Sequence, residues 1–260
     1  AGGISVLDAL RDDGSGTEQT PEQIHEAVDK SLKRLQTDYI DLYQLHWPDR
    51  PIRVFGGLGH KEMGGEINKI EDILGALADI QKAGKVRHFG LSNETPWGIM
   101  KFLHHAEMDK DLPRMVSVQN AYNLLNRIYE LGSSEIFHRE GVGLLAYSPL
   151  AQGYLTGKYQ GGAMPQGSRK QLFDRLQRYE VDGAEEVIDS YLDIAKKYEL
   201  DASQLANQFV TTRDFVTSNI IGATSMDQLK LAVTSIDVEL TEEILADIDK
   251  VHLRAPNLCP

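Results

Sequence analysis

One histidine stands where an imidazole could take part in chemistry. His46 directly follows an apolar run of strand length over residues 40–45, and Pro48 ends that run because proline cannot continue a ladder of strand hydrogen bonds. In α/β proteins with parallel strands, ligands meet the sheet at the carboxyl ends of the strands. His46 is therefore a candidate catalytic residue. The alternative is a structural histidine that bonds a loop carbonyl.

Three further segments of strand type also end in polar side chains. These ends are Ser92 and Asn93 after 86–91, Gln119 and Asn120 after 115–118, and Tyr147 and Ser148 at the close of 142–147. Four consecutive polar strand ends favour the mouth of a barrel over a doubly wound sheet, whose ligand crevice lies at a single switch point. A dinucleotide site of the Rossmann type is disfavoured because no G-x-G-x-x-G follows any of these strands.

The elements that must position these strand ends are helices alternating with the strands. Thr20-Pro21 and Thr95-Pro96 each place a capping residue before a proline, which predicts that a helix begins there. Further helices are predicted over 69–83, 129–139, 183–198, 203–211 and 241–253 and from Met226, with a strand over 219–221. This alternation predicts right-handed βαβ units and a parallel sheet in one domain over residues 1–260.

Glycine-rich connections follow two of the strands. Pro51–Asn68 is long for a connection in a compact domain, and a loop of this kind often covers a substrate. The glycines within 150–169 let the backbone approach a ligand closely, and Lys158 with Arg169 could hold phosphate. Residues 1–19 carry no sustained periodicity and are predicted to be loop.

A second candidate anion site precedes the helix predicted from Met226. Gly222, Thr224 and Ser225 place a glycine and two hydroxyls at a helix amino terminus, where unsatisfied N–H groups and the helix dipole favour phosphate. An ordinary Ser/Thr cap accounts for the same residues equally well. Both interpretations stay open from the sequence.

The composition excludes several classes of partner. The chain has 39 acidic and 27 basic residues and a net charge of −12, with no basic block that could follow a nucleic-acid backbone. Its single cysteine, Cys259, offers neither a disulfide nor a cysteine-based metal site, which fits a cytoplasmic location. No apolar run in the sequence is long enough to span a membrane, so membrane insertion is not expected. A start without methionine suggests a fragment or a trimmed chain.

Five ordered motifs resemble the aldo-keto reductase family. The resemblance is strongest to bacterial Tas-like reductases and to the β subunits of voltage-gated potassium channels, and it spans residues 38 to about 232. The motifs are D-L-Y-Q-L-H-W-P-D, G-K-V-R-H-F-G-L-S-N, V-Q-N-A-Y-N-L-L-N-R, L-L-A-Y-S-P-L-A-Q-G-Y-L-T-G-K-Y and I-I-G-A-T-S-M-D-Q-L. Together they are highly specific, whereas a single one would be weak.

The resemblance implies a (β/α)8 TIM barrel that binds NADP(H) and reduces a small aldehyde or ketone by direct hydride transfer. His46 resembles the catalytic histidine, which orients and polarises the substrate carbonyl. Ser92, Asn93 and Gln119 resemble the trio that binds the carboxamide, and Tyr147 resembles the aromatic residue stacked on the nicotinamide. The remaining cofactor residues are Ser148, Leu150, Gly153, Lys158 and Arg169 at the pyrophosphate and Gly222, Thr224, Ser225 and Gln228 at the adenosine 2′-phosphate.

Two departures from the family pattern bear on activity. Leu231 and Ala232 stand where many members place Glu and Asn to contact the adenine, so the preference between NADPH and NADH is open. The first recognisable element corresponds to the helix before the fourth strand, so the barrel is expected to be incomplete, with its first three βα units missing. Those units carry the Asp, the Tyr and the Lys of the catalytic set. His46 is therefore expected to be the only member present.

Two other functional classes are alternatives. A cofactor-binding regulatory subunit like the channel β subunits would use the same cofactor residues, but those proteins tend to lack a histidine at the position of His46. A metal-dependent hydrolase needs several inward histidines and aspartates at strand ends, whereas the eight histidines here are scattered, so no metal site is expected. The sequence leaves the oligomeric state and the natural carbonyl substrate open.

Overall fold

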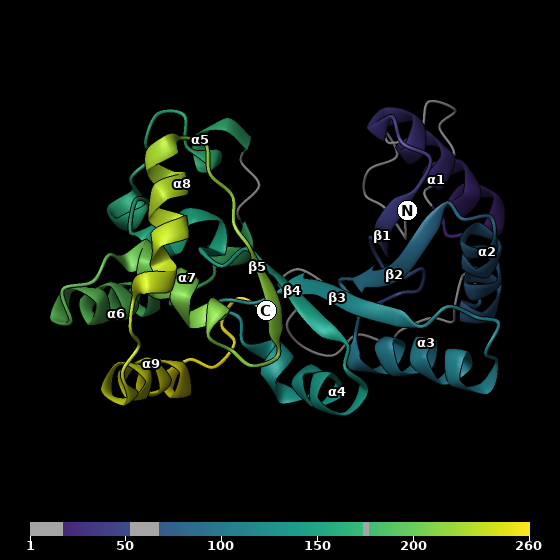
Figure 1. Cartoon of the computed structure of the whole chain (residues 1–260). Coiled ribbons are helices and arrows are strands. Elements are labelled where there is room, and N and C mark those ends of the chain that lie inside the picture. Colours follow the sequence, from purple (N-terminus) through teal and green to yellow (C-terminus); the bar gives the residue numbers. More distant parts are fainter. Residues whose placement is uncertain (1–17, 53–67, 174–176) are drawn as a thin grey trace. The chain divides into compact units, whose positions relative to one another are not determined.

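The computed structural model describes residues 18–52, 68–173 and 177–260 as strands alternating with helices (Figure 1). The strands form one five-stranded sheet in the order β1-β2-β3-β4-β5, so neighbours in the sheet are also neighbours along the chain. They span Ile40–Leu45 (β1), Val86–Ser92 (β2), Met115–Ala121 (β3), Gly143–Tyr147 (β4) and Val216–Ile220 (β5). The predicted parallel α/β sheet is confirmed, and it is consistent with an incomplete (β/α)8 barrel.

Helices connect the strands. They span Pro21–Leu35 (α1), Ile70–Lys82 (α2), Pro96–Met108 (α3), Ser133–Glu140 (α4), Arg169–Phe173 (α5), Ala184–Lys197 (α6), Ala202–Thr211 (α7), Met226–Val233 (α8) and Glu242–Arg254 (α9). Short 3-10 turns lie at Ile128–Leu131 (η2), Ala151–Thr156 (η3), Gln160–Gly162 (η4), Gln177–Tyr179 (η5) and Thr234–Asp237 (η6). None of the helices that the structure describes has both the length and the apolar character needed to cross a membrane.

Side-chain caps explain where α1 and α3 begin. The hydroxyl oxygen of Thr20 accepts the N–H of Gln23 at 3.3 Å, and that of Thr95 accepts the N–H of Gly98 at 3.2 Å. Each helix has proline in its first turn. Backbone N–H groups there have no intrahelical acceptor, so the N–H that proline lacks costs no hydrogen bond. Both predicted helix starts are confirmed.

The chain divides into two compact units. Among the described residues, the first unit holds 18–52, 68–120 and 135–144, and the second holds 121–134, 145–173 and 177–260. Two boundaries between the units fall within strands: one lies before the last residue of β3, and the other lies inside β4. The prediction of a single domain stays a prediction. The predicted loops over 1–19 and Pro51–Asn68 lie mostly outside the described residues.

In the first unit, parallel pairing brings the carboxyl ends of three strands to one edge. Leu45 of β1 lies opposite Leu91 of β2, and Ser92 lies opposite Gln119 of β3. Helix α2 contacts α1, β2 and α3 and has a continuous apolar face that includes the fully buried Leu74. The core of this unit therefore fixes the strand ends that carry the predicted trio and His46.

In the second unit, α7 contacts β5, α6 and α8, and its apolar residues form much of the core. The ring of Phe209 stacks on that of Tyr122 with centres 6.0 Å apart, and Phe215 meets Tyr122 edge-on at 5.3 Å. Aromatic pairs at these separations add to the stabilisation that burial provides.

Two predicted elements have different bounds in the structure. The strand predicted over 115–118 continues to Ala121, because the carbonyl of Gln119 still accepts the N–H of Asn93 at 3.0 Å. The strand predicted over 219–221 lies at Val216–Ile220. Polar side chains did not end the ladder, since pairing needs only backbone groups.

Two connections also differ from the prediction. The helix predicted over 129–139 is interrupted at Gly132, between η2 and α4, because the backbone there (φ −168°, ψ −38°) is not helical, a conformation that glycine tolerates. The stretch predicted as loop over 150–169 contains the turns η3 and η4. Positive φ values at Gly153 and Gly161 have no steric cost, but η3 also holds Ala151 and Gln152 at φ 47° and 57°, where a Cβ is strained.

Candidate active site

His46 is the first residue after β1, and its main chain is joined to the end of β2. The amide nitrogen Nδ2 of Asn93 donates to the His46 carbonyl at 2.9 Å. The His46 side chain is exposed, and its ring centre lies 5.0 Å from that of Trp47. An accessible imidazole at a strand end agrees with the catalytic alternative, which stays a prediction.

The three residues predicted to bind a carboxamide lie together in the first unit. The hydroxyl of Ser92 donates to the Gln119 carbonyl at 2.8 Å, and Nδ2 of Asn93 donates to the Ser92 oxygen at 3.2 Å. The backbone of Asn93 is left-handed, with φ 53°, a conformation that asparagine tolerates better than most residues. The structure thus brings Ser92, Asn93, Gln119 and the main chain of His46 into one hydrogen-bonded group.

Gln44 is a member of this group that the sequence analysis missed. Its Nε2 donates to Oε1 of Gln119 at 2.9 Å. Because this bond occupies the Gln119 oxygen, the Gln119 amide nitrogen is directed away from it and can donate to a bound carbonyl. The available signal was alternation, since Gln44 is a polar residue inside an apolar strand, two positions before His46.

A buried ion pair supports the chain just after these strand ends. Arg50 makes a two-point contact with Glu94, whose side chain is 3% exposed, and Nη2 of Arg50 also donates to the Thr95 hydroxyl at 3.1 Å. The Glu94 N–H donates to Oδ1 of Asn120 at 3.0 Å. These bonds link the segments that follow β1 and β2 to the end of β3, so they hold the predicted trio in place.

The protonation of His46 gives a testable dependence on pH. Desolvation lowers the pKa of the His46 imidazole below its ordinary value, although part of the ring stays accessible. The unfolded chain then binds the proton more readily than the folded chain. The contribution of His46 to the free energy of unfolding is therefore fully present above about pH 6.5 and is lost as the pH falls through the folded pKa.

We expect the wild-type chain to lose stability from about pH 7 to about pH 5, and His46→Gln to lose less over the same range. Urea midpoints at several pH values give this comparison. A proton NMR titration, with the His46 resonance assigned by its loss in the variant, gives the pKa itself. A His46 pKa at or above the ordinary value contradicts the expectation.

In the second unit, Tyr147 is the last residue of β4 and is held at both ends. Its carbonyl accepts the N–H of Tyr122 at 3.3 Å, and its hydroxyl bonds to the side chain of Arg178 and the backbone of Ala121. Burial raises the pKa of the Tyr147 phenol, and the bond to Arg178 opposes that rise. The residue as a whole is half-buried, and stacking of its ring on a nicotinamide stays a prediction.

The residues predicted at the pyrophosphate follow directly in the chain. The Ser148 carbonyl accepts the N–H of Ala151 at 2.9 Å, and the Leu150 carbonyl accepts the N–H of Gly153 at 2.8 Å. A Cβ on Gly153 would lie 2.8 Å from Nζ of Lys158, so glycine is what lets that lysine lie across the turn. The structure therefore brings Ser148, Leu150, Gly153 and Lys158 together.

Arg169, predicted beside the same phosphates, begins α5 and is exposed. In the described part of the chain, no hydrogen bond or ion pair links it to the turn that holds Lys158. The backbone N–H of the next residue, Lys170, donates to the Tyr159 hydroxyl at 3.4 Å, and Nζ of Lys158 lies 5.1 Å from the centre of the same ring. A role for Arg169 at the phosphates stays a prediction.

The turn before α8 has the bonds of an ordinary helix cap. The Ser225 hydroxyl oxygen accepts the N–H of Gln228 at 3.3 Å, and Oε1 of Gln228 accepts the N–H of Thr224 at 2.9 Å and its hydroxyl at 3.1 Å. Gly222 is exposed, and nothing lies within 4 Å of the position that a Cβ would take there. The four predicted residues lie together, but a phosphate site there stays a prediction.

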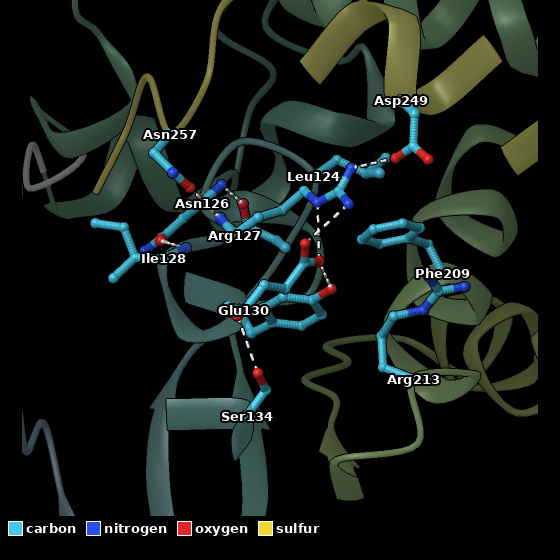
Figure 2. Close-up of polar contacts among 12 residues, drawn as sticks. Leu124, Asn126, Arg127, Ile128, Glu130, Ser134, Phe209, Arg213, Asp249 and Asn257 are labelled. Carbon is cyan, nitrogen blue, oxygen red and sulfur yellow. Dashed lines mark hydrogen bonds and ion pairs between the residues drawn. The ribbon is translucent and has the colours of Figure 1, made fainter. Parts of the chain in front are cut away.

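A second polar cluster, which we call the Arg127 network, lies in the second unit (Figure 2). The guanidinium of Arg127 donates twice to Glu130, at 2.8 and 2.9 Å, and once to Asp249 at 2.7 Å. The Tyr122 hydroxyl also bonds to Glu130, and burial beside this carboxylate raises the pKa of that phenol. Every nitrogen of the Arg127 guanidinium thus has a partner, which indicates a structural role.

Metal ligation has no support in the described residues, where no three His, Cys, Asp or Glu side chains lie close enough to hold an ion.

Two residues that the motifs did not indicate, Gln44 and Arg178, contact predicted site residues from distant positions in the sequence. Only folding shows that Gln44 bonds to Gln119 and Arg178 to Tyr147.

Comparisons with known proteins agree with the motifs. The pattern of the Aldo/keto reductase family matches residues 10–252. Protein tas of Escherichia coli (strain K12) is 50% identical over 232 residues, which cover 89% of this chain and 67% of that protein. An aldo-keto reductase of Babesia bovis is 38% identical over 248 residues, covering 89% of this chain and 86% of that protein. The NADH-specific methylglyoxal reductase of Escherichia coli (strain K12) is 27% identical over 225 residues, covering 86% and 62%.

Proposed function

Because this chain belongs to the aldo/keto reductase family of oxidoreductases, we propose that it binds NADP(H) and takes part in reducing aldehydes or ketones to alcohols. The observation that carries this proposal is the hydrogen-bonded group of Ser92, Asn93 and Gln119 beside His46. Its amide and hydroxyl groups can both donate to and accept from a carboxamide. When bound, the reduced cofactor supplies the hydride.

Taken by themselves, several residues of the second unit have chemistry suited to a dinucleotide. Tyr147 offers a ring face for stacking, which contributes roughly 1 kcal/mol beyond burial. Lys158 offers a cation to the pyrophosphate, and the N–H groups in the first turn of α8 that the Ser225 cap does not occupy favour an anion. Leu231 and Ala232 on α8 offer no polar group to the adenine, so NADH is a second candidate cofactor.

His46 has a defined role in this proposal. A neutral imidazole can donate one N–H to the substrate carbonyl, and that bond strengthens as negative charge develops on the oxygen. The lowered pKa of His46 keeps the ring neutral at neutral pH. His46 thereby orients and polarises the carbonyl while the imidazole itself stays uncharged.

The proton for the developing alkoxide needs another donor. Burial raises the pKa of Tyr43 to about 12, and this residue lies inside β1 with a buried side chain. The Tyr147 hydroxyl is already bonded to Arg178. Neither phenol suits proton donation near neutral pH. We propose that the chain by itself binds cofactor but turns over slowly.

Cofactor titration tests the proposal. The intact chain is expected to quench its tryptophan fluorescence on binding NADPH, and Tyr147→Ala is expected to raise the Kd about tenfold, because the ring loses both its stacking and its buried area. Tyr198→Ala is the matched control, since that hydroxyl bonds Asp247 on α9 at 2.9 Å. NADH is titrated in parallel to decide between the two cofactors.

Three outcomes each contradict part of the proposal. Equal Kd values for the wild type and Tyr147→Ala remove Tyr147 from the site, and no saturable binding of either cofactor removes the proposed function. Absorbance at 340 nm with a reactive aldehyde gives the turnover. Turnover at ordinary enzyme rates, roughly 1 per second or faster, shows that the residues present suffice for proton donation.

A further inference from the structure

The contacts around Arg178 form a continuous chain of bonds to the predicted stacking residue. The Arg178 side chain bonds to the Tyr147 hydroxyl, and its guanidinium carbon lies 5.8 Å from the ring centre of Tyr179. The Tyr179 hydroxyl accepts Nδ2 of Asn123 at 3.0 Å, and the same nitrogen donates to the Ser148 carbonyl at 2.9 Å. Tyr147 and the residue after it are therefore both bonded into one cluster.

The other side of Arg178 is bonded to residues 257–260. Nε of Arg178 donates to the Pro260 carbonyl at 2.9 Å, and the N–H of Cys259 donates to the Leu125 carbonyl at 3.1 Å. Oδ1 of Asn257 accepts the N–H of Arg127 at 2.7 Å (Figure 2). Cys259 is fully buried. This segment, which we call the carboxyl tail, thus has three separate attachments in the second unit.

We propose that Arg178 is a positioning residue that fixes the hydroxyl of Tyr147 and takes its own position from the carboxyl tail. The inference rests on the proposed function, because the ring that Arg178 orients is the one proposed to stack on the nicotinamide. A guanidinium suits this task, since its planar fork can donate from Nε to Pro260 and from its other nitrogens to Tyr147. A lysine has a single nitrogen and cannot reproduce that geometry.

Positioning has a consequence that simple stabilisation lacks. A ring whose hydroxyl is fixed loses less rotational freedom when a ligand stacks on it, so binding is tighter. Removing Arg178, or removing the tail that holds it, therefore weakens stacking even where the fold persists. The effect must vanish when Tyr147 has no hydroxyl to hold.

The test is a double-mutant cycle in the intact chain. Arg178→Gln is expected to raise the Kd for NADPH about fivefold, and Arg178→Lys to do so less. In a Tyr147→Phe background the same change is expected to alter the Kd by less than about twofold, because the coupled bond is already absent. Arg254→Gln is the control, since this exposed arginine bonds only to Ser190, at 3.2 Å, among the described residues.

A second readout needs no cofactor. In a chain labelled with ¹³C at tyrosine Cζ, the Tyr147 resonance, assigned by its loss in Tyr147→Phe, is expected to shift in Arg178→Gln and after deletion of residues 258–260. Urea midpoints show which variants remain folded. Arg178→Lys replaces Arg178→Gln if the latter unfolds.

The outcomes separate the two proposals. An unshifted Tyr147 resonance in the folded Arg178 variant overturns the positioning role, whatever the cofactor titration gives. Equal effects of Arg178→Gln on Kd in the two backgrounds also overturn it. If the wild type binds neither NADPH nor NADH, the proposed function fails, and the resonance still decides whether Arg178 and the tail hold Tyr147.

Discussion

Replacing Gly98 by alanine is expected to destabilise the protein by about 2 kcal/mol, although alanine is the better helix former. Gly98 lies in the first turn of α3, where the buried Arg50–Glu94 ion pair packs directly against its Cα. A methyl group at Gly98 would overlap both the Glu94 carboxylate and the Arg50 guanidinium. One of them must move, and the buried side chain of Glu94 has no solvent to move into.

Gly75→Ala is the matched control. Gly75 lies within α2 of the same unit, and nothing stands within 4 Å of the position that its Cβ would take. Here the helix preference acts alone, so alanine is expected to stabilise by about 0.5 to 1 kcal/mol. The measurement is the free energy of unfolding in urea. Changes of the same sign at both glycines would show that the ion pair does not restrict residue 98.

Replacing Arg127 by methionine is expected to lower the free energy of unfolding by about 3 kcal/mol. Methionine keeps much of the apolar stem but leaves Glu130 and Asp249 without their shared partner. The Arg127 side chain is only 10% exposed and that of Glu130 is 23% exposed, so water replaces the guanidinium at Glu130 only in part. The change also removes the guanidinium that faces the Phe209 ring at 5.2 Å.

The control for Arg127 is an ion pair of similar spacing on the surface. Lys250 bonds Asp247 three residues earlier on α9, at 2.8 Å, and its side chain is 74% exposed. Water and salt screen such a pair, so Lys250→Met is expected to leave the urea midpoint unchanged within error. If the two variants unfold at the same midpoint, the Arg127 network contributes no more than a surface pair does.

Local signals in the sequence predicted most of the fold. Thr20-Pro21 and Thr95-Pro96 predicted two helix starts because a cap and a proline act within one turn. The break at Gly132 could not be predicted in this way. The residue type alone does not decide the matter, because glycine tolerates both a helical backbone and the non-helical one found there, with φ −168° and ψ −38°.

The candidate site was predictable to the extent that its residues stand at strand ends. His46, Ser92, Asn93 and Gln119 share that position, and parallel pairing brought their main chains together. Residues that act on other side chains carry no such mark. Gln44 orients the Gln119 amide from inside β1, and only the register of the sheet reveals it.

The contact between Arg127 and Asn257 joins residues 130 positions apart. During synthesis, Arg127 leaves the ribosome long before Asn257 has been translated. The hydrogen bond from the Arg127 N–H to Asn257 therefore forms late. Closing a chain segment of this length costs entropy before any contact repays it, which slows folding. The second unit therefore completes its hydrogen bonding only after Asn257 has been translated, and a chain stalled shortly before that residue leaves the Arg127 N–H without its acceptor.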